Sequence, residues 1–263
     1  MLRISFLLLV SAVTLNSFAQ ASAQQDTSAQ QDTRAQQDTS VVEQAEFTAL
    51  EYQLVKDSGL LSLSQQVKYS AQRMIALALE QPEGPDTVTI NHAQHFAIAK
   101  NLAQRWAEEQ WQQRLLQLVH EMPIATQALI QQQLAHPMIQ AAQRKERAAI
   151  SVQHNPEYQK YMNKLRQHPP AASRWQLVER LDQQSGFSQM IIQARRVVIK
   201  EIQGQVDGWQ PEEQWQNQTR QEVLEFLFYA YRKTPNGELQ NIAKSFNQPQ
   251  LSQFYRAVRK AIF

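Results

Sequence analysis

Two histidines near the middle of the chain have a spacing that metal ions use. His92 and His95 are three residues apart, which places both imidazoles on one face of a helix. No Asp, Glu or Cys lies beside them in the sequence, whereas a zinc site needs at least three protein ligands. We therefore interpret the two residues as surface histidines and expect neither a metal nor another cofactor.

A second pattern pairs histidine with methionine, the ligand types that copper accepts. His120 and Met122 are repeated as His136 and Met138 at the other end of one expected helix. Sixteen residues of continuous helix would separate the two pairs by about 24 Å. We expect them not to share an ion.

Carboxylates between aromatic rings offer the materials of a sugar-cleaving site. Glu108 and Glu109 lie between Trp106 and Trp111. A glycosidase needs two carboxyl groups roughly 5 to 10 Å apart across the bond, yet adjacent helical residues point about 100° apart. Buried tryptophans with solvated glutamates are therefore favoured, and a helical hydrolase of a cell-wall polymer stays as the alternative.

Other catalytic signatures are missing from the sequence. It has no Cys and no G-x-S-x-G elbow, and its 6 glycines do not form a P-loop or a dinucleotide fingerprint. The sequence therefore leaves the catalytic residues unknown.

The elements that must position these side chains are helices. Gln, Ala, Leu, Glu and Arg dominate from Val41 onward, and alternating β-branched residues are nearly absent outside 87–90. We expect an all-α protein, an irregular bundle or array of about nine or ten helices joined by short loops.

Proline, glycine and capping residues predict where these helices begin and end. We expect helices over 41–56, from Ser62 or Ser64 to Pro82, and from Asn91, which Gln94 completes as a capping box, to about His120. Pro123 should interrupt the chain. The other expected signals are first-turn prolines at 137, 156, 211, 235 and 249, caps at Asn155 and Thr234, and stops at Gly186, Gly204 and Gly208.

The C-terminal part has the most distinctive sequence. Only Glu225 is polar in the block 223–231, so this helix should be buried on most of its circumference, although it is too short to cross a membrane. We expect the helices that follow, which carry Leu239 and Phe254, to close over it. A weak boundary near 204–211 would divide a helical domain over 41–204 from a C-terminal helical unit over 205–263.

The N-terminus has the three parts of a secretory signal. Arg3 precedes an apolar stretch, and a small-residue site ends at Ala23. We expect residues 1–23 to be removed and the protein to be periplasmic or secreted, without stable membrane insertion. Behind the site, AQQDTS, AQQDTR and AQQDTS follow one another, so 24–40 should be a disordered leader because it has no large apolar residue to bury.

Charge and composition exclude some partners. The formal net charge is +2, and an exported chain so close to neutral is not expected to bind nucleic acid. Basic runs at 144–147, 195–196 and 256–260 are interpreted as solvated helix faces, or as contacts with an anionic envelope surface. The oligomeric state does not follow from the sequence.

Two segments resemble a known group of proteins. The aromatic helix, the turn Thr234–Gly237 and the next helix are similar to the C-terminal helical pair of exported bacterial proteins classed as a domain of unknown function. The segment KDSGLLSLSQQV over 56–67 resembles a helix pair in their N-terminal part. The resemblance implies an exported helical protein and assigns no activity or site residue.

These observations favour a soluble envelope protein with a non-catalytic binding or structural role, whose partner is an envelope component or another protein. The alternatives are the hydrolase and a carrier of small ligands, which would need a continuous apolar cavity between helices. An open groove at 106–111 would favour the hydrolase, and a packed pair of tryptophans would favour the binding protein.

Overall fold

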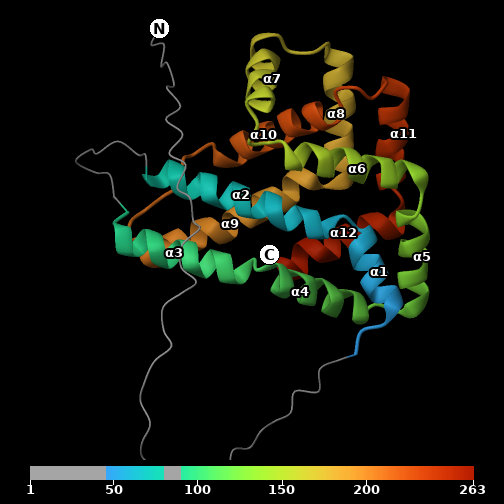
Figure 1. Cartoon of the computed structure of the whole chain (residues 1–263), viewed down its shortest axis with the longest axis horizontal. Coiled ribbons are helices and arrows are strands. Elements are labelled where there is room, and N and C mark those ends of the chain that lie inside the picture. Colours follow the sequence, from blue (N-terminus) through green and yellow to red (C-terminus); the bar gives the residue numbers. More distant parts are fainter. Residues whose placement is uncertain (1–45, 80–89) are drawn as a thin grey trace, which may run out of the picture. The chain divides into compact units, whose positions relative to one another are not determined.

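Twelve α-helices and no strand make up the described part of the chain, residues 46–79 and 90–263 of this computed structural model (Figure 1). The all-α prediction is confirmed, and the expected count of nine or ten helices was slightly low. The expected signal peptide, the expected repeat leader and residues 87–89 of the β-branched segment 87–90 lie outside the described residues. The helices are α1 (Ala49–Asp57), α2 (Leu60–Leu79), α3 (His92–Arg105), α4 (Glu108–His120), α5 (Ile124–Leu134), α6 (Pro137–Ser151), α7 (Pro156–Gln167), α8 (Ala172–Ser185), α9 (Phe187–Gln205), α10 (Trp215–Ala230), α11 (Asn236–Phe246) and α12 (Pro249–Ile262).

The expected long helix from 91 to 120 is two helices, which is a correction. α3 ends at Arg105 and α4 starts at Glu108, with Trp106 and Ala107 between them. In a continuous helix, Trp106 and Trp111 would point about 140° apart. The break lets both indoles enter the core, where each is almost fully buried. Burial of two large rings outweighs the few hydrogen bonds lost at the break.

Several capping predictions are confirmed. Asn91 and Gln94 form the expected capping box, with N···O distances of 2.9 and 3.0 Å. Prolines 137, 156 and 249 occupy the first turns of α6, α7 and α12. Gly186, with φ of 68°, ends α8 in the left-handed conformation that suits glycine.

Other boundary predictions were wrong. α10 begins at Trp215, so Pro211 precedes it, and α9 continues through Gly204. Asn155 is the N-cap residue of α7 but makes no side-chain cap bond. Pro235 is itself the N-cap of α11, while the hydroxyl of Thr234 accepts a hydrogen bond from Lys145 and is not used as a cap. α2 begins at Leu60, before Ser62.

The aromatic block 223–231 is buried throughout, as predicted. Its coverage differs from the prediction, because α10 contacts mainly α9, α6, α8 and α7. α11 instead packs on α8 and α6, and α12 packs on α5 and α4, so the last two helices close other faces of the core. A buried helix does not reveal from its own sequence which elements bury it.

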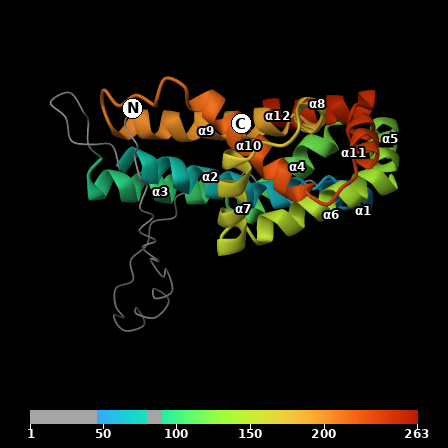
Figure 2. The same ribbon diagram turned by 90° about the horizontal axis from the view of Figure 1, so that it is seen from above.

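Helices α2 and α9 position many of the residues of the candidate functional site. These helices lie side by side, and α3 contacts both of them (Figures 1 and 2).

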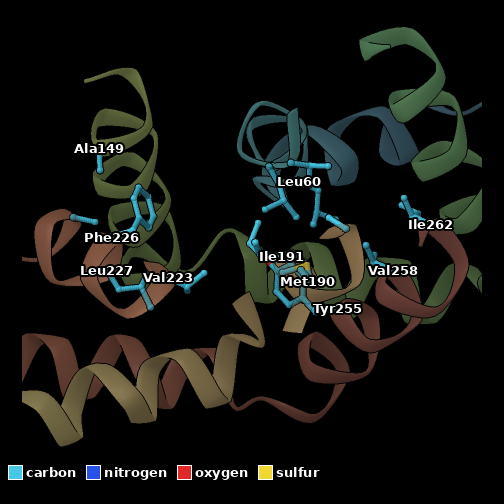
Figure 3. Packing of buried hydrophobic residues seen from close by; sticks show 14 of the residues in the cluster. Leu60, Ala149, Met190, Ile191, Val223, Phe226, Leu227, Tyr255, Val258 and Ile262 are labelled. Atoms are coloured by element: carbon cyan, nitrogen blue, oxygen red, sulfur yellow. The ribbon is translucent and has the colours of Figure 1, made fainter. Parts of the chain in front are cut away.

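Residues 45–263 form one compact unit, and the expected boundary near 204–211 falls inside it. No helix among the described residues is long and apolar enough to cross a membrane. Figure 3 shows two parts of the core, in which α10 lies beside Ala149 while Met190 and Ile191 lie with Leu60 and Tyr255.

Candidate functional site

The tryptophan segment is a packed structural element. The indole N–H of Trp111 donates to the Leu60 carbonyl oxygen at 2.9 Å, and its ring lies 5.6 Å from that of Phe263. Glu108 and Glu109 are exposed in the first turn of α4. The rings and the carboxylates therefore face opposite surroundings, and the segment forms no open groove with both.

The four histidines singled out in the sequence lie at helix ends. His92 is exposed and His95 is partly buried at the start of α3. The Nδ1 atom of His120 lies 2.9 Å from Oε1 of the buried Glu51, and Nδ1 of His136 accepts the backbone N–H of Met138 as a cap of α6. Among residues 46–79 and 90–263, no group of three or more His, Cys, Asp or Glu side chains is arranged to hold a metal.

A cavity that the sequence did not predict lies between α2, α7, α9 and α10. Its volume is about 70 Å³, which is room for several water molecules or for one small polar group. Three arginines and two glutamates line it, so its formal charge is +1. We call it the arginine cavity, and its charged residues are Arg73, Arg166, Arg195, Glu222 and Glu225.

Arg195 is the central group of this cavity. Its side chain extends from α9 and the residue is only 6% exposed. Its guanidinium donates to Ser70 Oγ and to Thr219 Oγ1, each at 2.7 Å, and to a carboxylate oxygen of Glu222. Arginine has five N–H donors, and these contacts use three of them. Two donors of a buried cation therefore have no hydrogen bond to the described residues.

Ion pairs hold the other charged residues in place. Glu222 bridges two arginines, with one carboxylate oxygen on Arg195 and the other 3.3 Å from Arg73. The Nε and Nη2 atoms of Arg166 donate hydrogen bonds to Oε2 of the buried Glu225, at 3.1 and 2.7 Å. Arg73 and Arg166 are about half exposed, so they line the side of the cavity nearest to solvent. The carboxylates of Glu222 and Glu225 are therefore both paired with arginines.

Gln66 adds a further unused donor. The residue is 7% exposed, and its Nε2 atom is buried with no hydrogen-bond partner among the described residues. A buried amide without a partner costs roughly 1 to 3 kcal/mol. The spacing of Gln66, Ser70 and Arg73 places them on one face of α2, toward the cavity.

Tyr158 contributes a neutral hydroxyl to the wall. Burial is the main cause that raises its pKa far above the usual range, and the nearby Tyr69 and Glu225 raise it further. The phenol therefore keeps its proton at all ordinary pH values. With Arg195 and Gln66, it makes the cavity rich in donors.

Comparison with known proteins gives no guide to this cavity. The chain matches no family model, no curated protein and no solved structure. The site is therefore interpreted from its geometry alone.

Few of the residues of the arginine cavity could be identified from the sequence. The 195–196 pair was interpreted as a solvated helix face, which is wrong for Arg195 because that side chain is buried. Glu225 stood out in the sequence only as the one polar residue of the apolar block 223–231. Its partner Arg166 lies 59 residues away, and no local pattern connects the two.

Proposed function

We propose that the protein is an exported, non-catalytic binding protein whose arginine cavity holds the anionic group of a small ligand. The unused N–H donors of the buried Arg195 carry this proposal. An anion would occupy these donors and balance the excess positive charge of the cavity. Carboxylate and phosphate groups share this chemistry.

The side chains of the arginine cavity are better suited to binding a ligand than to catalysing a reaction of it. A general acid or base needs a carboxyl group that is free to exchange a proton with the ligand. Here Glu222 and Glu225 are each held in charge-assisted hydrogen bonds to arginines. They orient the guanidinium groups of the cavity.

The size of the cavity limits what enters it. About 70 Å³ accommodates the anionic group, while the rest of a ligand would extend past the half-exposed Arg73 and Arg166. The five charged residues of the lining do not suit a wholly apolar cargo. The carrier alternative, which required a continuous apolar cavity, draws no support from this site.

Replacing Gln66 by methionine tests the proposal. The change keeps the side-chain length and removes an unpartnered polar group, so thermal stability should stay the same or rise. Binding of the anion should weaken by roughly tenfold, the effect of about 1.4 kcal/mol from one lost hydrogen bond. Calorimetric titration with inorganic phosphate and with acetate measures the loss and shows which anion is preferred.

A matched control is Gln184→Met on α8. Gln184 also has a buried amide atom without a partner, Oε1, but it does not line the arginine cavity. This variant should bind the anions as the unaltered protein does. Absence of binding to both phosphate and acetate, or equal affinities for the Gln66→Met and unaltered proteins, would contradict the proposal.

The proposed location makes a separate prediction. If export removes residues 1–23, the mature chain begins at Gln24, since Ala21 and Ala23 present the small side chains that a signal peptidase accepts. Intact-mass analysis of protein recovered from outside the cytoplasm measures this directly. A mass that still includes Met1 would argue against cleavage.

A further inference from the structure

A second cavity lies on the other side of Phe187, whose ring also lines the arginine cavity. It consists of two adjoining hollows of about 50 and 30 Å³, which share five residues. We call it the acidic cavity, and the shared residues are Gly59, Leu63, Gln143, Glu146 and Phe187. Aromatic rings of Phe187, Phe246 and Tyr255 form much of the wall of the larger hollow.

Glu146 is the acidic group of this cavity. Its Oε1 atom accepts a hydrogen bond from the Tyr231 hydroxyl at 2.7 Å. No Lys, Arg or His nitrogen among the described residues forms an ion pair with it, and the adjacent Lys145 is paired with Glu238 at 2.6 Å. Burial raises the pKa of Glu146 to about 7, although Tyr231 and the exposed Arg147 pull it down. The carboxylate thus lacks a cationic partner.

Gln143 supplies a second acceptor. The residue is 4% exposed, and its Nε2 donates to the Asp57 carbonyl oxygen at 2.7 Å. That bond fixes the orientation of the amide, since a flipped amide would place two oxygen acceptors against each other. Oε1 of Gln143 is then buried with no partner among the described residues. The larger hollow therefore presents two acceptors, and its hydroxyl groups donate to backbone carbonyls, while Arg147 lines only the smaller hollow.

We propose that the acidic cavity binds a primary ammonium group of a small ligand. An ammonium carries three N–H donors and one positive charge, which match the Gln143 oxygen and the Glu146 carboxylate. Aromatic walls attract a cation through their ring faces. A calcium ion would need six or more oxygen ligands, which these two side chains do not supply. This site does not depend on the anion proposed for the arginine cavity.

The proposal requires binding to depend on pH. The ammonium pairs with ionised Glu146, so affinity falls as pH decreases below the pKa of about 7. Tyr231, Tyr255 and Arg147 are the other ionisable groups that face or act on Glu146. Burial raises the pKa of both tyrosines, so neither of them titrates in this range.

Methylammonium chloride is the probe for this test, with sodium chloride at equal ionic strength as the reference. The carboxyl ¹³C resonance of Glu146 in the folded full chain should show a pKa that methylammonium lowers. The affinity should rise about tenfold between one pH unit below and one unit above that pKa. Tetramethylammonium, which has no N–H donor, should bind more weakly.

Two variants separate this site from general charge effects. Glu146→Gln can still accept the Tyr231 hydrogen bond but has no charge, so methylammonium binding and its pH dependence should both disappear. Gln143→Met should weaken binding while Glu146 still titrates, and Gln66→Met in the arginine cavity should leave it unchanged. A Glu146 pKa that methylammonium does not move in the unaltered protein would overturn the proposal, even if a variant fails to fold.

Discussion

A chain that ends after Lys233 should lose its cooperative thermal transition and aggregate. This truncation removes α11, which covers α8 and α6, and α12, which covers α4 and α5. It also removes the Tyr255 hydroxyl that donates to the Ser58 carbonyl oxygen and the Phe263 ring that lies against Trp111. Large apolar faces would then contact water, and exposed patches of that kind cause association.

The measurements are sedimentation of the expressed protein and a thermal melt followed by far-UV circular dichroism. The full-length chain, prepared in parallel, is the control. If the shortened chain stays soluble with an unchanged melting temperature, α11 and α12 are an appendage and do not close the core.

Phe226→Ala should lower the free energy of unfolding by about 3 to 5 kcal/mol, the usual cost of truncating a buried aromatic side chain. Phe226 is 4% exposed, and its ring stacks on that of Phe187 with centroids 5.7 Å apart. The substitution leaves a void where the arginine cavity meets the core. Chemical denaturation of both proteins measures the difference.

Phe96→Ala is the matched control for that prediction. Phe96 is on α3 and is 69% exposed, so its truncation should change the free energy of unfolding by no more than about 0.5 kcal/mol. Equal effects of the two substitutions would show that Phe226 is not in the core.

Local signals in the sequence predicted the helical class and many helix ends. Asn91 with Gln94, the three first-turn prolines and Gly186 act through their own backbone neighbourhood, so their effect is visible in a short segment. The apolar block 223–231 likewise predicted a buried helix.

Features that depend on packing between distant segments were not predictable in this way. No Gly or Pro marks the break between α3 and α4, which exists because two tryptophans enter one core. The local sequence predicted Thr234 as a helix cap, but its hydroxyl accepts a hydrogen bond from Lys145, which is 89 residues away in the chain.

The two cavities likewise combine features that a local sequence pattern can predict with features that depend on packing between distant segments. Helical spacing brings Gln66, Ser70 and Arg73 to one face of α2, which a sequence can show. It cannot show that α9 places Arg195 beneath that face, or that Glu146 turns inward from a basic run to meet Tyr231. Charged residues are usually solvated, so a buried one is recognised only when its partners are known.

The bonds of Arg195 have a consequence for how the protein opens. One guanidinium joins Ser70 of α2 to Thr219 and Glu222 of α10 while its own backbone belongs to α9. Moving α2 or α10 away would take hydrogen-bond partners from a buried charge, which is more costly than losing a surface contact, and moving α9 away would break all of these bonds. We therefore expect the three helices to open together in local unfolding, and fluctuations of lower free energy to occur in elements outside them.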